Sequence, residues 1–193
     1  MLDIGCGHGY WLRSMTERGF EVVGVEPDSA RVADAAASLN GAGPARVVAG
    51  DGVRLPLRDG SVSLVWCIHV LHHLDDPVAA LAEVARVLRP GGHFIVAETV
   101  EDNPLIRVGR RIHPAWAGVP VLSRFTAGTL LRLLGEAGLD VVDRRQHSLA
   151  SFAAWTLPRL GRKAWLSLSR LEDRLPGWTA HWGAHLECVA RRA

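Results

Sequence analysis

The sequence has few cysteines and no long apolar run. Its three cysteines (Cys6, Cys67 and Cys188) are an odd number without Cys-x-x-Cys spacing, so we expect buried thiols in a reducing cytoplasm and no metal site. No apolar stretch reaches the roughly 20 residues that cross a bilayer. The N-terminus also lacks the basic and apolar regions of a signal peptide. The sequence therefore indicates a cytoplasmic protein without a transmembrane segment.

A strong excess of charge is also missing. The net charge is +2, the basic residues are scattered, and Lys163 is the only lysine, which argues against a nucleic-acid partner. The chain has 193 residues, of which 48% are apolar and 22% charged, as in ordinary globular proteins. This length suits one domain over residues 1–193.

Helical and extended patterns alternate along the chain, which predicts a mostly parallel sheet with helices on both faces. Asp28 or Ser29, Asp76 and Thr126 are expected to cap helices. A break at residues 90–92 is expected before a strand at 94–96. The other expected strands cover residues 1–4, 20–25, 46–49, 62–70, 139–142 and 186–190. Two segments, 99–125 and 148–182, interrupt the alternation and are expected to cap the substrate side.

The segment Leu2-Asp3-Ile4-Gly5-Cys6-Gly7-His8-Gly9 places an apolar strand and an acid before a loop with glycine at every second position. Glycines there let the chain turn tightly and let a ligand approach the main chain, because no Cβ is in the way. Dinucleotide-binding folds need the spacing G-x-G-x-x-G, but the third glycine comes one residue early and Tyr10 takes its place. A nicotinamide-dependent oxidoreductase is therefore disfavoured.

Acidic residues end the next two expected strands. Glu26 follows Gly9 by 17 residues, a place from which a carboxylate can accept hydrogen bonds from ribose hydroxyls. The alternative is an ordinary surface acid at a strand end. Asp51-Gly52 ends the following strand and is also a common turn dipeptide.

Four separated blocks resemble the class I S-adenosylmethionine-dependent methyltransferases. They are the D-x-G-x-G-x-G loop and residues 59–65, 71–77 and 86–92, which appear in the family's order across residues 2–98. The resemblance implies a Rossmann-like three-layer α/β/α sandwich whose seven-stranded sheet ends in an antiparallel strand. It implies S-adenosylmethionine as cofactor, with Glu26 on ribose, Asp51 on the adenine amino group and Asp3 on the loop or the methionine amino group. The full set of expected cofactor-binding residues is Asp3, Gly5, Cys6, Gly7, Gly9, Glu26, Pro27, Asp51, Gly52 and Cys67.

Members of this family usually carry helices ahead of the glycine loop, and these helices close over the cofactor. Here Met1 falls inside the first expected strand. We expect either a misassigned start or a shortened protein.

The resemblance also bears on the methyl acceptor. Many DNA and protein amide methyltransferases carry an Asn/Asp/Ser-Pro-Pro-aromatic stretch, whereas this chain has Cys67-Ile68-His69-Val70 at that place. A small-molecule acceptor is therefore favoured, with transfer to an O, N or C nucleophile. His69 and, in the insertion, His113 are candidate general bases, and a structural hydrogen-bonding role is the alternative for His69.

Two questions stay open in the sequence. The tryptophan-rich helices expected at 152–160 and 164–175 either pack over the substrate pocket or lie against a membrane surface as a peripheral contact. The alternatives to methyl transfer are another S-adenosylmethionine-dependent reaction and a non-catalytic partner subunit. The sequence does not indicate the oligomeric state.

Overall fold

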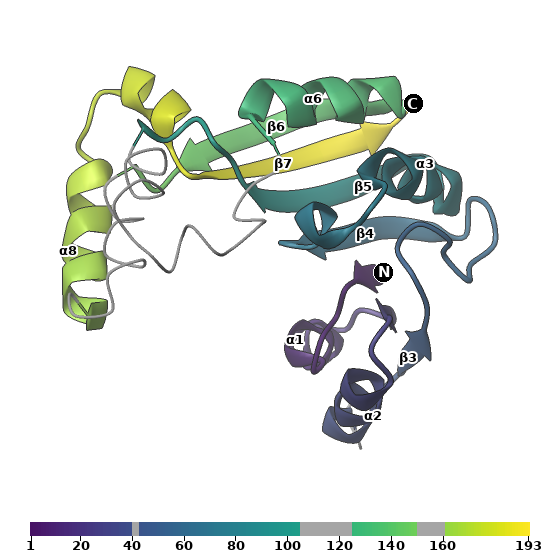
Figure 1. Ribbon diagram of the computed structural model, residues 1–193. Helices are drawn as coiled ribbons and strands as arrows, with labels where there is room; N and C mark the ends of the chain where they lie inside the picture. Colours follow the sequence, from purple (N-terminus) through teal and green to yellow (C-terminus); the bar gives the residue numbers. More distant parts are fainter. Residues whose placement is uncertain (40–42, 105–124, 150–160) are drawn as a thin grey trace. The chain divides into compact units, whose positions relative to one another are not determined.

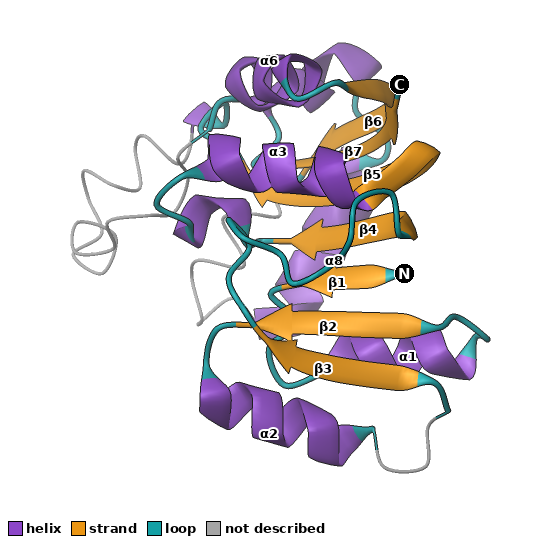
Figure 2. Ribbon diagram, turned by 90° about the vertical axis from the view of Figure 1, so that its right-hand side faces the viewer, coloured by secondary structure: helices purple, strands orange, loops and turns teal. Residues whose placement is uncertain are grey.

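The computed structural model describes residues 1–39, 43–104, 125–149 and 161–193. Seven strands form one sheet in the order β3-β2-β1-β4-β5-β7-β6 (Figures 1 and 2). The strands are β1 (Leu2–Ile4), β2 (Val22–Glu26), β3 (Ala45–Ala49), β4 (Val62–Ile68), β5 (Leu88–Thr99), β6 (Leu139–His147) and β7 (His185–Arg192). The sheet is mostly parallel, and β7 runs opposite to β6 (Figure 1), which confirms the expected fold class.

Side chains at three expected positions cap the helices that connect the strands. Asp28 accepts a hydrogen bond from the amide of Ala30 at 2.8 Å, and Asp76 accepts one from the amide of Ala79 at 2.9 Å. Thr126 Oγ1 accepts one from a backbone amide in the first turn of its helix at 3.1 Å. Each cap satisfies an amide that has no partner within its helix. The helices are α1 (Tyr10–Glu17), α2 (Ser29–Ser38), α3 (Pro77–Val87) and α6 (Ala127–Glu136).

The expected break at residues 90–92 is wrong, because β5 begins at Leu88, directly after α3. Leu88 already has extended backbone angles (φ −65°, ψ 137°), so the chain changes from helix to strand at one residue. The strand β6 is also longer than expected and continues through residues 143–147, which are polar. Because β6 is last in the sheet order, its polar residues lie on an edge strand and give no apolar signal.

The two helices after β1 and β2 share a small apolar core. Leu12 of α1 and Ala35 of α2 are fully buried and pack with Cys6, Val22 and Leu39. Burying a leucine side chain contributes about 1.5–3 kcal/mol, so this cluster anchors the loop that contains Cys6.

The chain divides into two compact units. The first contains residues 1–96, 132–143 and 188–193, and the second contains residues 97–131 and 144–187. The second unit includes α8 (Gly161–Glu172), which overlaps the helix expected at 164–175, and a 3-10 helix, η3 (Gly177–Trp182). The helix expected at 152–160 lies outside the described residues. Within the described ranges, none of the helices has the length and apolar character needed to span a membrane.

Candidate cofactor-binding site

The candidate site lies where the strand order reverses. From β1 the chain continues to β2 and β3 on one side, and β4 pairs with β1 on the other side. These pairings are parallel: Ile4 lies opposite Val25 on β2 and opposite Cys67 on β4, and Glu26 lies opposite Ala49 on β3. Parallel strands place their carboxyl ends at one edge, and ligands of open α/β sheets bind at such a reversal. The expected binding residues of these four strands therefore emerge at one edge of the first unit.

The three glycines of the loop after β1 have different roles. All three have positive φ angles: 70° at Gly5, 54° at Gly7 and 80° at Gly9. A Cβ on Gly5 would lie 2.5 Å from a methyl group of Val70, and one on Gly9 would lie 3.0 Å from the backbone of Ala35. Among the residues that the structure describes, a Cβ on Gly7 would meet nothing within 4 Å. Packing thus explains two glycines, while the space beside Gly7 is open to a ligand.

Glu26 links the end of β2 to the glycine loop. Its side chain is buried, with 3% exposure. Oε2 accepts a hydrogen bond from the amide of Gly7 at 3.0 Å, and Oε1 accepts one from the amide of Asp28 at 3.3 Å. A carboxylate has about four acceptor positions, so capacity for ribose hydroxyls remains. The sequence pointed only to the ribose role, because the bond to Gly7 joins residues 19 positions apart.

Asp3 is a buried acid in β1, one residue before the strand ends. Its side chain is 3% exposed, and within the described part of the chain Oδ2 has no hydrogen-bond partner. Burial, and secondly the negative charge of Glu26, raises the pKa of Asp3 to about 7. Burial, followed by the charges of Asp3 and Glu26, raises the pKa of Cys6 to about 12, so this thiol stays protonated. An unpartnered carboxyl group beside an open loop suits a ligand that brings a positive charge.

The remaining expected cofactor residues lie at the ends of β2, β3 and β4. Asp51 is exposed, and its Oδ1 accepts a hydrogen bond from the amide of Val53 at 3.1 Å, which is the turn that its sequence indicated. Gly52 is buried after Asp51, and Pro27 is exposed after Glu26. Cys67 is fully buried on β4. Asp51 therefore combines the turn with a carboxylate that faces solvent.

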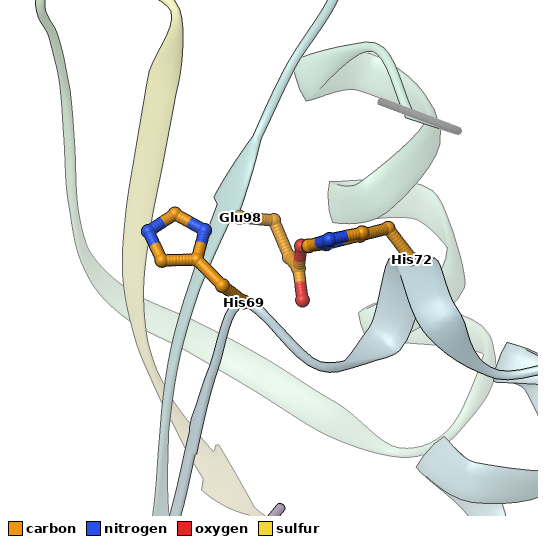
Figure 3. Close-up of side chains that lie close together, drawn as sticks. All are labelled: His69, His72 and Glu98. Atoms are coloured by element: carbon orange, nitrogen blue, oxygen red, sulfur yellow. The ribbon is translucent and has the colours of Figure 1, made fainter. Parts of the chain in front are cut away.

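The candidate base His69 follows directly after β4. It is exposed and has a φ of 55°, which is uncommon for a residue other than glycine. The 3-10 helix η1 (Leu71–His73) carries His72, which is buried and whose ring centroid lies 6.3 Å from that of His69. Figure 3 draws both imidazoles and the carboxylate of Glu98, a residue of β5. Because metal ions use such donors, the expected absence of a metal stays a prediction. His113 lies outside the described residues.

Comparison with known proteins identifies the first half of the chain. Residues 2–96 match a family model described as a methyltransferase domain. These residues belong to that family. An uncharacterized methyltransferase of Mycobacterium sp. (strain KMS) is 41% identical over 105 residues, which are 54% of this chain and 40% of the relative. The chain thus spans less than half the length of this curated relative.

Solved structures extend the likeness of the methyltransferase fold to the whole chain. The cyclase SpnF has a TM-score of 0.68 at 24% identity, covering 99% of this chain and 74% of its own. A putative methyltransferase from Haloferax volcanii, solved in complex with the Trm112 activator, has a TM-score of 0.71 at 24% identity, covering 98% and 80%. At such identities the likeness shows the fold alone.

The cofactor of the methyltransferase family, S-adenosylmethionine, fits the residues that are present. Its ammonium group matches the unpartnered Oδ2 of Asp3, and its extended shape can follow the open backbone beside Gly7. Its hydroxyl groups match the remaining acceptor positions of Glu26.

Proposed function

We propose that the methyltransferase domain transfers a methyl group from S-adenosylmethionine to an oxygen, nitrogen or carbon nucleophile of a small molecule. The observation that carries this proposal is the pair formed by the unpartnered carboxyl oxygen of Asp3 and the open space beside Gly7. Both lie at the reversal of the strand order, where a ligand of such a sheet binds.

Each residue of the proposed site has a binding role. Asp3 would accept hydrogen bonds from the ammonium group of the cofactor, and Glu26 would accept them from the ribose while it holds Gly7 in place. Asp51 would accept a hydrogen bond from the adenine amino group, with Gly52 giving close access to the backbone. The cofactor supplies a sulfonium that is already activated toward nucleophiles. The protein therefore has to hold the acceptor in line with the methyl group.

His69 is the proposed general base for an acceptor that must lose a proton. It follows Cys67 by two residues, and Cys67 pairs with Ile4, the residue before Gly5. The base and the glycine loop therefore leave the sheet on adjacent strands. The exposed imidazole is accessible to an acceptor, and an imidazole is a side chain suited to proton transfer near neutral pH.

Two neighbours in fold define alternatives to simple methyl transfer. A cyclase shares the fold, so binding of S-adenosylmethionine alone does not establish which reaction occurs. A putative methyltransferase of this fold was solved with an activator protein, which is consistent with a domain that works in an assembly. Methyl transfer remains the proposal because curated relatives with similar sequences are named methyltransferases.

The test separates binding from reaction. Isothermal calorimetry with S-adenosylhomocysteine should show one site per chain, and Asp3→Ala should lose most of the affinity. The exposed acid Asp140 of β6 provides a control, because Asp140→Ala changes a carboxylate outside the site. Incubation with labelled S-adenosylmethionine and panels of phenols, amines and carbon acids should then label one class of acceptor. Binding with no labelled product from any panel would contradict methyl transfer and favour the alternatives.

A further inference from the structure

The second unit contains a cavity of about 630 Å³ that the proposed methyl transfer does not use. Its wall combines the end of β6, the end of α8, the 3-10 helix η3 and the start of β7. A volume of this size falls within the range of small-molecule sites. Three of its lining residues, His147, Ser148 and Glu187, are joined by hydrogen bonds.

The three side chains form a chain of donors and acceptors. Ser148 Oγ lies 2.8 Å from His147 Nδ1, and His147 Nε2 lies 3.1 Å from Glu187 Oε1. An ionised carboxylate can only accept, so Nε2 carries the proton that is donated to Glu187. Nδ1 is then unprotonated and accepts the hydrogen bond of the Ser148 hydroxyl. This order of groups is that of a hydroxyl nucleophile with its base and the acid that orients the base.

The backbone at Ser148 is held in an unusual conformation. Its φ is 69°, a left-handed value that residues other than glycine rarely adopt. The buried amide of Asn103 donates hydrogen bonds to the carbonyls of Ser148 at 3.2 Å and Leu149 at 2.9 Å. The amide of Ala184 donates a third, to Ser148, at 3.2 Å. Strained residues that are supported in this way cluster at functional sites.

Neighbouring groups also fix the imidazole of His147. Its ring stacks on that of His185, with centroids 5.6 Å apart and planes inclined by 24°. A Cβ on Gly183 would lie 2.3 Å from the carbonyl oxygen of His147, so only glycine permits this approach of the two backbones. Gln146 Nε2 donates hydrogen bonds to the carbonyls of His181 and Gly183, both at 3.0 Å. The base is thus held by its own ring contacts and by the backbone on either side.

We propose that Ser148 is the nucleophile of an esterase activity toward small carboxylic esters that bind in this cavity. Ser148 Oγ attacks the carbonyl carbon and its proton passes to His147 Nδ1. The bond from carbon to the leaving oxygen breaks, and the alcohol departs with that proton. Water then attacks the acyl-serine, gives one proton to His147 and releases the carboxylic acid, and His147 returns the proton to Ser148. Glu187 is a positioning residue, because it acts through His147.

A fluorophosphonate probe tests the nucleophile directly. The intact chain should gain one adduct by mass spectrometry, peptide mapping should place it on Ser148, and the chain should hydrolyse p-nitrophenyl acetate. Ser148→Gly should abolish labelling and lower hydrolysis at least about 100-fold, the range expected when such catalysis is lost. Glycine tolerates the φ of 69°, so this variant keeps the turn. Ser61→Ala changes an exposed serine outside the cavity and should label like the wild type.

Three variants test the relay. His147→Gln should lose labelling about as fully as Ser148→Gly. Glu187→Gln should label about tenfold more slowly, and Glu187→Asp should restore most of the rate, because a carboxylate again accepts the hydrogen bond of His147 Nε2. Circular dichroism establishes that each variant is folded. No adduct on the wild type, an adduct at another residue, or unchanged hydrolysis in Ser148→Gly would overturn the proposal.

Discussion

Two strand ends in this molecule turn through left-handed backbone angles and use different residues for it. After β1 the turn uses Gly5, Gly7 and Gly9, which adopt such angles without a Cβ clash. After β6 the turn uses Ser148, which is held by the buried amide of Asn103, 45 residues earlier. The first turn leaves open space beside its backbone, whereas the second presents a hydrogen-bonded hydroxyl. A left-handed turn can therefore expose backbone to a ligand or aim a side chain.

The difference in residue type decides which turn can be recognised in a sequence. Glycines at alternate positions are a local pattern, so the amino-acid sequence alone reveals the first turn. A serine in the same conformation depends on contacts with distant residues, and nothing next to it marks the strain. The following predictions test whether the two turns differ as described, from the largest expected effect to the smallest.

Gly7→Val should abolish binding of S-adenosylhomocysteine while leaving a folded domain. The branched side chain would occupy the open space and disfavour the φ of 54°. Gly19→Val is a matched control, because Gly19 also has a positive φ, of 87°, and a Cβ added there would meet no atom of the described residues within 4 Å. Calorimetry on both variants, with thermal melts, separates backbone strain from loss of the ligand's space. Equal affinities of the two variants for S-adenosylhomocysteine would mean that the ligand does not approach Gly7.

Asn103→Ala should lower the free energy of unfolding by about 2–3 kcal/mol, because it leaves two carbonyls without this donor in a buried setting. Ser148→Gly should instead stabilise the fold by about 1 kcal/mol through relief of the left-handed strain. Urea titrations of both variants and of the double variant give the coupling. If Asn103 supports the strained turn, Asn103→Ala should lower the free energy of unfolding by less in the Ser148→Gly background than in the wild type. Strictly additive effects of the two substitutions would contradict that support.

Glu26→Ala should weaken binding of S-adenosylhomocysteine by about 1–3 kcal/mol, as expected when a buried hydrogen-bonding partner is lost. The same variant frees the amide of Gly7, so the loop loses an anchor as well. Glu17→Ala, on the exposed face of α1, should bind normally. Unchanged affinity in a folded Glu26→Ala variant would remove this residue from the site.

The raised pKa of Asp3, about 7, predicts that cofactor binding depends on pH. A ligand ammonium favours the ionised carboxylate, so affinity should rise through neutral pH and be about tenfold weaker at pH 6 than at pH 8. Calorimetry in buffers of different ionisation enthalpy should detect the released proton. Asp3→Asn should remove this dependence, and a pH dependence that survives the substitution would assign it to another group.

The same raised pKa predicts a change in stability without ligand. The folded-state pKa lies above the unfolded value of 3.8, so the folded protein binds more protons between about pH 4 and pH 7. The stability that protonated Asp3 contributes is therefore lost as the pH rises through this window. The free energy of unfolding of Asp3→Asn should exceed that of the wild type by the largest amount above pH 7. Urea titrations at pH 4 and pH 8 measure this difference.

Removal of metal ions should have no effect, which is the smallest change predicted. The sequence indicated no metal, although His69 and His72 carry groups that bind metals. Treatment with a chelator should leave the affinity for S-adenosylhomocysteine and the melting temperature unchanged. A loss of either, restored by one divalent ion, would contradict this expectation.

Local patterns were sufficient for most of the fold. The alternation of helices and strands, the caps at Asp28, Asp76 and Thr126, and the glycine loop all depend on residues close together in the chain. The family resemblance added the seven-stranded sheet with an antiparallel last strand, which is confirmed. The start of β5 was wrong because proline and glycine usually interrupt a strand, whereas here they lie at its beginning.

The sequence by itself determined which residues are available for a cofactor, because β-strand, acid and glycine spacing encode local geometry. Only the tertiary structure separated Gly7, which is open, from Gly5 and Gly9, which are packed, since Val70 and Ala35 come from distant segments. The tertiary structure also decided the burial that raises the pKa of Asp3 and the contact between His147 and Glu187. Burial and long-range hydrogen bonds depend on which segments the fold brings together, and no local pattern contains that information.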